Sequence, residues 1–442
     1  MSQDKDSRLI EALKEMFPRD WLVHTARQVG AVKRRRDVDI VALFWTLVLG
    51  FGVARQRTLA ALQRSFVLNG GAMISATAFN NRFHGGLVGL LDAALERALQ
   101  VSGQTSSSAL RGTLARFEDV LALDATLIRL HESLADRWPG TRVNHSPASL
   151  KIHVVHSLRD QGVSRIKMTS GKVNDRKGWR RFGPWIKGRL MMMDLGYYCA
   201  RHFARIEDNE GFFLSRLFGN ANPVIVANNR KHRGCPRDIV GFAVRDIAPE
   251  LHRSVLDVNV AVTYRKRPYG GRKTGRQDTR IWRVIGVRLE GEWRFYITNI
   301  MSDMTPEQLV ELYRLRWQVE LLFKVLRSEY KIAEMPSQRP EAVKALLLCG
   351  LLTMLVHQRL IDVVRPEMAP EEAINLQRAH AALRIISPVL HYKLMRDLGL
   401  IRGDQCLFDY LLFFLRDPNR SRLTQPVFAQ SPDFETISQV FA

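Results

Sequence analysis

Cysteine is scarce in this chain of 442 residues, and its positions match no metal or disulfide motif. The four cysteines, at positions 199, 235, 349 and 406, contain no CxxC pair. The sequence therefore lacks a zinc ribbon, and so few isolated thiols argue against a disulfide framework. Isolated cysteines are typical of a reducing compartment, so we expect a cytoplasmic protein.

Long apolar runs are also missing. The longest extends from Ala345 to Val356 and is interrupted by Gly350 and Thr353, whereas a membrane-spanning helix needs about 20 apolar residues. This run predicts a buried helix. The N-terminal stretch MSQDKDSRLIEALKEMF is charged and amphipathic, unlike a secretory signal. We therefore expect no membrane partner.

Acidic residues are too few to balance the basic ones. Lys and Arg number 66 against 44 Asp and Glu, which gives a net charge of +22 and a pI near 10.3. A field of this sign favours a polyanionic partner, most commonly nucleic acid. An anionic membrane surface would also suit the charge, but the sequence has no basic amphipathic anchor and no lipidation signal.

The order of the predicted elements indicates several structural units. Residues 1–110 and the chain after Thr305 are predicted to be helical. Between them we predict strands at 120–130, 151–158, 164–169, 189–194, 211–216, 256–264, 280–289 and 293–298, with a helix at 200–210. A central group of strands with helices on both flanks implies a mixed α/β core between two helical regions. A helix apolar on nearly all sides is predicted at 40–53, and Ser75 or Thr77 is expected to cap a helix running through Phe83.

Two basic segments have open interpretations. The run Lys33–Arg36 is either a solvated charge cluster or a DNA contact. The segment Arg265–Arg276 carries six basic residues and a tyrosine between glycine-containing turns. It is either a DNA-contacting tip or the solvated end of a hairpin.

Two aspartates occupy apolar strands. Asp124 lies in the middle of LALDATLIRL, and Asp194 follows the apolar run in GRLMMMDLGYY. An ionised carboxylate in such a place is costly unless a partner compensates it, and a metal ion is one such partner. The alternative for each is an aspartate that caps a turn at a strand end.

A third carboxylate, Glu320, lies on a helix with well-marked ends. Thr305, Pro306 and Gln308 form a capping box with proline at the first helical position. At roughly 100° per residue, one face of this helix carries Tyr313, Arg316, Trp317, Glu320, Lys324 and Arg327. An adjoining stripe is apolar and consists of Leu312, Leu315, Val319, Leu322, Phe323 and Leu326. A Glu–Lys surface pair is the simpler explanation of Glu320, but it does not account for the aligned aromatic and cationic residues.

Phosphodiester chemistry explains why three carboxylates and several cations belong together. Two Mg²⁺ ions about 3.5–4 Å apart can activate a water or a 3′-hydroxyl and stabilise the leaving oxygen. Carboxylate oxygens suit Mg²⁺, and Mn²⁺ is expected to substitute for it. Basic residues one helical turn away would hold neighbouring phosphates. The pair His153 and His156 lacks the further ligands that zinc requires.

The segment YRLRWQVELLFKVLRS resembles the Y-(2)-R-(3)-E-(6)-K signature of bacterial transposases of the insertion-sequence-four type, which include the Tn-five-like enzymes. Tyr313, Arg316 and Glu320 match the signature, while Arg327 stands where the family usually has lysine. Lys324 matches a further basic position. Arginine binds phosphate as a fork and lysine as a point charge, so this exchange is expected to alter the grip on DNA.

The resemblance extends over roughly 120–327. DATLIRL is similar to the family's first-Asp segment and MMMDLGYY to its second, which implies that Asp124, Asp194 and Glu320 are the catalytic, metal-binding carboxylates. Tyr313, Arg316, Lys324 and Arg327 are then the implied DNA-binding residues. In relatives that use a DNA hairpin, an aromatic residue stacks on a flipped base. Trp282 and Trp293 are candidates, although tryptophan on a strand more often belongs to the core.

The fold implied by the resemblance is an RNase H-like mixed β-sheet core with a β-rich insertion and helical flanks. The gap of 126 residues between Asp194 and Glu320, against 70 between the aspartates, leaves room for that insertion. The expected regions are a helical DNA-end-binding part (1–110), the core in two pieces (111–225 and 301–335), the insertion (226–300) and a helical C-terminal part (336–442), for which dimerisation is the suggested role.

The implied function is a DNA transposase that binds terminal inverted repeats and cleaves at the element ends. It would transfer the 3′-hydroxyl ends to target DNA as a homodimer on double-stranded DNA. Two alternatives remain at this point. One is a metal-dependent DNA nuclease on the same core without strand transfer, and the other is a DNA-binding regulator derived from a transposase.

Overall fold

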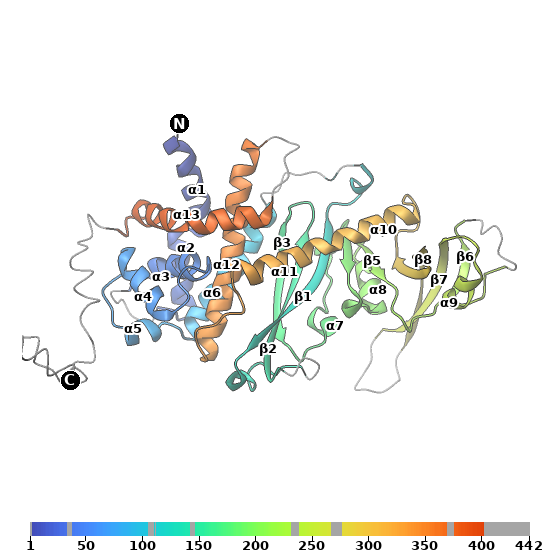
Figure 1. Cartoon of the computed structure of the whole chain (residues 1–442), viewed down its shortest axis with the longest axis horizontal. Coiled ribbons are helices and arrows are strands. Elements are labelled where there is room, and N and C mark those ends of the chain that lie inside the picture. Colours follow the sequence, from blue (N-terminus) through green and yellow to red (C-terminus); the bar gives the residue numbers. More distant parts are fainter. Residues whose placement is uncertain are drawn as a thin grey trace, which may run out of the picture.

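A computed structural model describes residues 2–32, 38–104, 110, 112–141, 146–230, 238–266, 276–368 and 375–401. The basic run Lys33–Arg36 and most of Arg265–Arg276 lie outside these residues, so their two interpretations stay open. The molecule is elongated: helices from both ends of the chain form one end, the sheet occupies the middle, and the predicted insertion forms the other end (Figure 1).

The N-terminal part is helical, as predicted. It contains α1 (Ser2–Met16), α2 (Arg19–Gln28), α3 (Ile40–Thr46), α4 (Leu59–Leu68), α5 (Ala76–Asn80) and α6 (Gly85–Gln104). The predicted core helix at 40–53 is α3 continued by a π-helix, Leu47–Phe51, and all of these residues are buried. Ser75 caps α5 by accepting a hydrogen bond from Ala78 N. This helix stops at Asn80 and is shorter than predicted.

Nine strands form one mixed sheet in the order β3-β2-β1-β4-β5-β9-β8-β7-β6. The strands of its first half are β1 (Val120–Leu130), β2 (Ala148–Ser157), β3 (Gly162–Ser170), β4 (Leu190–Met193) and β5 (Phe212–Arg216). β1 is antiparallel to β2 and parallel to β4, and β4 is parallel to β5. Short helices connect them: α7 (Asp175–Gly178) and α8 (Ala200–Asp208).

The insertion continues this sheet instead of forming a separate one. Its strands are β6 (Val224–Asn228), β7 (Val255–Arg265), β8 (Gln277–Leu289) and β9 (Glu292–Thr298), with α9 (Val244–Ile247) between β6 and β7. β9 pairs antiparallel with β5 and joins the two halves. The strand β6 was not predicted, because this five-residue edge strand exposes Val224 and Val226 and carries no clear alternating pattern.

The chain after the sheet is helical. It forms α10 (Pro306–Arg314), α11 (Gln318–Ser328), α12 (Pro340–Val364) and α13 (Leu376–Asp397). The predicted capping box is present, since Thr305 Oγ1 accepts from Gln308 N and Gln308 Oε1 accepts from Thr305 N. The prediction of one uninterrupted α-helix from Thr305 was wrong. A 3₁₀ turn, η7 (Leu315–Trp317), separates α10 from α11.

α12 is longer than the apolar run, Ala345–Val356, from which it was predicted. By length and composition, Pro340–Glu367 could cross a membrane, and it is the single such helix among the residues described. However, 78% of its most apolar stretch is buried inside the protein. It packs against α1, α6 and β3, so it fits the core helix that the sequence predicted.

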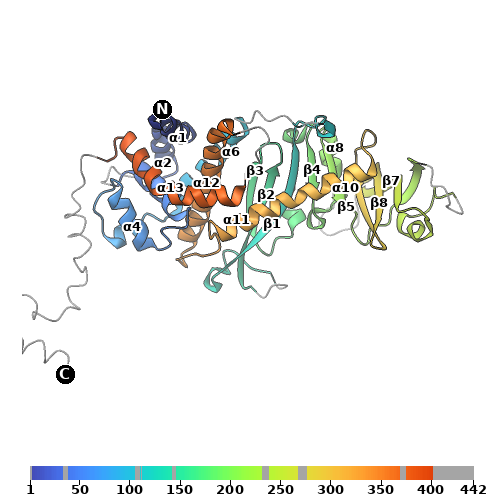
Figure 2. The ribbon, with the colours of Figure 1, turned by 45° about the horizontal axis from the view of Figure 1, so that its top comes forward.

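The sheet separates two apolar cores. Ala122 and Met192 belong to the core shared with the N-terminal helices, α11 and α12, whereas Leu123 and Met193 belong to the core on the other face. Side chains alternate along a strand, so Asp124 and Asp194 both point to the α11 side. The α10–α11 segment runs across this face from the helical end toward the insertion (Figures 1 and 2).

Candidate active site

Asp124 lies at the middle of β1 on a partly buried stretch. Its Oδ1 accepts a hydrogen bond from Ala125 N at 2.7 Å, and its Oδ2 lies 3.2 Å from Arg316 Nη1. Burial raises the pKa of Asp124 to about 6, against the opposing effects of the Ala125 N–H and the Arg316 charge. Asp194 and Glu320 raise this pKa further, so the three carboxylates lie close enough to repel one another.

Asp194 directly follows β4. In the parallel pairing of β1 and β4, Leu123 lies opposite Met193, which places Asp124 and Asp194 next to each other where β4 ends. The Asp194 carboxylate accepts no hydrogen bond from the residues that the structure describes, and it lines an open cleft. It does not cap the following turn, so the turn-capping alternative does not apply to it.

Glu320 belongs to the first turn of α11 and reaches the aspartates through Arg316. Arg316 Nη2 donates to Glu320 Oε1 at 2.7 Å while Nη1 contacts Asp124. The Nε atom of Arg316 is buried without a hydrogen-bond partner. No three His, Cys, Asp or Glu side chains among the described residues are gathered in metal-binding geometry. Instead, a guanidinium cation joins two of the predicted ligands.

The donor set nevertheless suits a hard divalent cation. All three groups are carboxylates, they come from neighbouring elements of one face, and one of them is free of hydrogen bonds. The guanidinium of Arg316 lies between Asp124 and Glu320, which indicates that these carboxylates need a positive charge beside them. The residues present therefore fit Mg²⁺ or Mn²⁺.

Tyr313, predicted to hold DNA, is 8% exposed in this structure. Its hydroxyl donates to the Met193 carbonyl oxygen at 3.1 Å, and its ring packs edge-on against Tyr296 with the centroids 5.2 Å apart. This contact ties α10 to the residue that precedes Asp194. Tyr313 also borders the open cleft.

Lys324 and Arg327 extend the same helix face. Lys324 is exposed on α11 and forms no hydrogen bond or ion pair within the described part of the chain. Arg327 donates a hydrogen bond to Thr126 Oγ1, which lies two residues beyond Asp124 on the same face of β1. Both cations therefore lie on the α11 side of the sheet, with Arg327 beside the first aspartate.

Three arginines and a tyrosine that the sequence did not assign to the site border the cleft beside Asp194. The cleft measures about 500 Å³ and is bordered by Arg216 from β5, Arg294 and Tyr296 from β9, and Arg314 from α10. Trp317 also borders it and is 58% exposed. These residues come from strands far apart in the sequence, and no local pattern connects them.

The two tryptophans that the sequence suggested for base stacking pack elsewhere. Trp282 is fully buried, and its Nε1 donates to Glu207. Trp293 stacks on Phe295 with the ring centroids 5.8 Å apart, and Arg288 covers it. The core interpretation therefore fits Trp282, whereas the large exposed aromatic near the carboxylates is Trp317.

Residues 115–356 match the family model described as Transposase DDE domain. The chain belongs to this family. A transposase of insertion sequence element IS421 from Escherichia coli is 33% identical and is aligned over 78% of this chain and 90% of its own length. The transposase of IS231F from Bacillus thuringiensis subsp. israelensis is 22% identical over 86% of this chain and 87% of its own length.

The fold of this transposase has a counterpart among solved structures. A piggyBac transposase in a synaptic complex with hairpin DNA superposes with a TM-score of 0.50 at 10% identity. The match covers 98% of this chain and 89% of that one. At this identity the likeness shows the fold alone, and it confirms the predicted RNase H-like α/β architecture with a mixed sheet.

Family membership supports the predicted function at the same level. The transposase is a DNA-cleaving, strand-transferring enzyme of the DDE type, and DNA is its partner. Enzymes of this family generally depend on a divalent metal.

Proposed function

We propose that Asp124, Asp194 and Glu320 are the catalytic carboxylates and that they bind Mg²⁺, for which Mn²⁺ can substitute. The observation that carries this proposal is that the guanidinium of Arg316 joins Asp124 of β1 to Glu320 of α11, while Asp194 follows β4 beside Asp124. The chemistry that two such ions supply when bound is activation of a water or 3′-hydroxyl and stabilisation of the leaving oxygen of a phosphodiester.

The protein's own residues would hold the DNA strand in line. Arg316, Lys324 and Arg327 lie along the face of η7 and α11, and the cleft beside Asp194 adds Arg216 and Arg294. Phosphates bound by these cations would fix the scissile phosphate opposite the carboxylates. Tyr313 would border the same strand while it holds α10 against Met193. When DNA arrives, Arg316 would exchange its carboxylate partners for a phosphate.

In this proposal the enzyme binds the terminal inverted repeats of an insertion sequence and cleaves at its ends. The freed 3′-hydroxyls then attack target DNA directly, without a covalent protein–DNA intermediate. The helical part at 1–110 would recognise the ends, the strands within 226–300 would support the DNA, and the C-terminal helices within 336–442 would pair two subunits. A homodimer suits the task because two ends must meet in one complex. Its place would be the bacterial cytoplasm, at the nucleoid.

A strand-transfer assay separates this function from the two alternatives. The protein is incubated with Mg²⁺, labelled DNA carrying element ends and an unlabelled target plasmid. Label joined to the plasmid is expected. Cleavage without joining would indicate a nuclease, and end binding without cleavage would indicate a regulator.

The controls for this assay isolate the carboxylates. Glu320→Gln should keep end binding and lose both products. Glu311→Gln, at a 69% exposed side chain on the neighbouring helix, should behave as the wild type. Unchanged cleavage by Asp124→Ala and Glu320→Gln would contradict the assignment of the site.

A further inference from the structure

A second cleft lies at the edge of the sheet formed by β3, and its cations are on the face opposite the carboxylates. It measures about 750 Å³ and includes residues of α6, β3 and the segment before β4. Lys167 pairs with His153, and Asp124 pairs with Val154, which is the next residue along β2. Because neighbouring residues of a strand point to opposite faces, Lys167 and Asp124 point away from each other.

Five cations border this back-face cleft, and they differ in whether a carboxylate balances their charge. Arg159 is paired with Asp160, and Arg189 lies 3.5 Å from Glu118. Arg165, Lys167 and Arg181 form no ion pair with the described residues, and all three are exposed. The cleft thus presents three positive charges that the protein leaves unbalanced.

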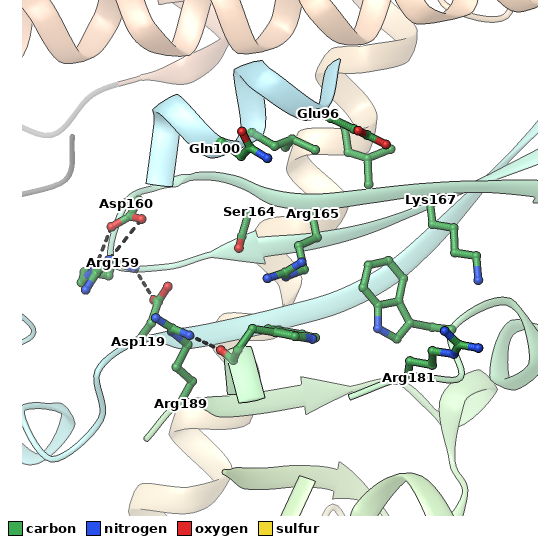
Figure 3. Close-up of a pocket in the computed structure, with 14 residues that line it drawn as sticks. Glu96, Gln100, Asp119, Arg159, Asp160, Ser164, Arg165, Lys167, Arg181 and Arg189 are labelled. Carbon is green, nitrogen blue, oxygen red and sulfur yellow. Dashed lines mark hydrogen bonds and ion pairs between the residues drawn. The ribbon is translucent and has the colours of Figure 1, made fainter. Parts of the chain in front are cut away.

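The carboxylates of the cleft do not neutralise these charges. Asp119 is buried, and its oxygens accept hydrogen bonds from Ser157 Oγ and Val120 N, each at 2.7 Å. Asp160 is engaged by Arg159. Glu96 stands with Gln100 on the α6 side of β3, whereas Arg165 and Lys167 extend from the other side toward Arg181 and Arg189 (Figure 3).

Aromatic side chains hold part of this cationic surface in place. The guanidinium of Arg165 lies 4.3 Å from the ring centroid of Trp185, an arrangement that orients a cation without neutralising it. Burial, with the nearby charge of Arg189, lowers the pKa of Arg165. Trp179 also borders the cleft, and its buried indole N–H has no hydrogen-bond partner. A bound anion would relieve the charge repulsion and could accept from these donors.

We propose that the back-face cleft binds the phosphodiester backbone of DNA through Arg165, Lys167 and Arg181, away from the catalytic carboxylates. This inference rests on the proposed function. Lys167 and Asp124 are two strands and one residue apart in the sheet, so their Cα atoms lie about 10 Å apart at strand spacings of about 4.8 Å and rises of about 3.3 Å. At about 3.4 Å per nucleotide, that distance corresponds to about three nucleotides. The bound phosphates belong either to the flank of the cleaved duplex, bent around the β3 edge, or to a second duplex.

Salt-dependent DNA binding tests this proposal. We compare the wild type with the variant Arg165→Ala/Lys167→Ala/Arg181→Ala on an end-bearing duplex and on an unrelated duplex, using fluorescence anisotropy. The affinity should fall at least about tenfold on both, because phosphate contacts carry no base information. The slope of log K against log salt should decrease by about 0.9 for each lost contact, and by up to about 3 in total.

A charge-matched control removes three arginines elsewhere. Arg253→Ala/Arg378→Ala/Arg396→Ala takes away the same charge from exposed positions outside the cleft. It should bind with nearly the wild-type slope. If the cleft variant and this control bind alike while both remain folded by thermal unfolding, the proposal is wrong.

The length of the DNA distinguishes the two sources of phosphate. An effect confined to duplexes that extend more than about three nucleotides beyond the cleavage site assigns the cleft to the flank of the same DNA. An equal effect on shorter duplexes assigns it to a second duplex. If the wild-type protein cleaves end DNA and the cleft variant binds DNA like the control, this inference alone is overturned. Wild-type protein that binds no DNA overturns the proposed function as well.

Discussion

Arg316 Nη2 lies 2.7 Å from Glu320 Oε1, and the same guanidinium contacts Asp124 from its other amino group. The side chain thus supplies positive charge where we propose that divalent ions bind. The contact with Glu320 could be predicted, because the two residues are four positions apart on one helical segment. The contact with Asp124 could not, because the two residues are 192 positions apart. This arrangement makes Arg316 a competitor of the metal as well as a candidate phosphate ligand.

The first prediction concerns this competition. Arg316→Ala should bind Mn²⁺ more tightly than the wild type, by about tenfold, because one cation is removed from between two carboxylates. DNA cleavage should fall in the same variant. Isothermal titration of the DNA-free protein measures the affinity. Lys187→Ala removes an exposed lysine that pairs with Glu210 outside the cleft beside Asp194 and should leave it unchanged. A weaker or equal affinity of Arg316→Ala for Mn²⁺ would show that the guanidinium does not occupy the metal's place.

The second prediction concerns the segment that leads into α10. Arg283 donates to both oxygens of Asp257 at 2.8 and 2.6 Å, and to the carbonyl oxygens of Ile300 and Met304. Both side chains of the pair are about 5% exposed. Arg283→Met should lower the free energy of unfolding by about 3–5 kcal/mol, because Asp257 is left buried and unpaired. Urea denaturation measures this loss.

A surface pair provides the matched control for Arg283. Arg280→Met removes an arginine that is 30% exposed and contacts Glu207 and Asp208. Its cost should be about 1 kcal/mol or less. The double variant Arg283→Met/Asp257→Leu should recover much of the lost stability, since it removes both buried charges. If Arg283→Met lowers the free energy of unfolding no more than Arg280→Met does, the result would be inconsistent with a buried ion pair.

The third prediction is a loss of stability in acid. Tyr330 Oη lies 2.9 Å from His357 Nδ1 and 2.5 Å from His380 Nδ1, which joins the segment after α11 to α12 and α13. Burial lowers the pKa of His380 from 6.5 to about 4 and the pKa of His357 well below 6.5. Between about pH 6.5 and about pH 4, these two histidines bind protons in the unfolded chain but not in the folded protein. Their contribution to the free energy of unfolding is therefore fully present above about pH 6.5 and decreases as the pH falls toward about 4.

Thermal unfolding between pH 7.5 and pH 4.5 measures this dependence. His380→Phe should reduce the decline, since a pKa displaced from 6.5 to about 4 corresponds to up to about 3 kcal/mol. His252 is exposed, so His252→Asn should decline like the wild type. An equal decline in His380→Phe would indicate that other groups cause the acid sensitivity.

The elements around the site could be predicted from the sequence because their signals are local. β1 has the predicted bounds, and the capping box at Thr305 starts α10 as expected. Alternation of side chains on β1 and β4 then places Asp124 and Asp194 on one face. The apolar stripe with Val319 and Leu326 is buried against β1 and β2, as the helix periodicity predicted.

Features that depend on distant contacts could not be predicted. The 3₁₀ turn at 315–317 has no proline or glycine to announce it. The joining of β9 to β5 makes the insertion a continuation of the core sheet, and no short-range pattern encodes that pairing. The burial of Tyr313 follows from its bond to Met193, 120 residues earlier. Both clefts also bring together residues from separate elements.

The most direct test of the three-carboxylate site is the position of Mn²⁺ in a crystal of the protein, measured by anomalous scattering. We predict a peak within about 2.0–2.4 Å of oxygens from Asp124, Asp194 and Glu320, with Arg316 moved away from both of its present partners. A Mn²⁺ peak elsewhere, or no peak at saturating Mn²⁺ with the Asp124–Arg316–Glu320 contacts intact, would contradict the site.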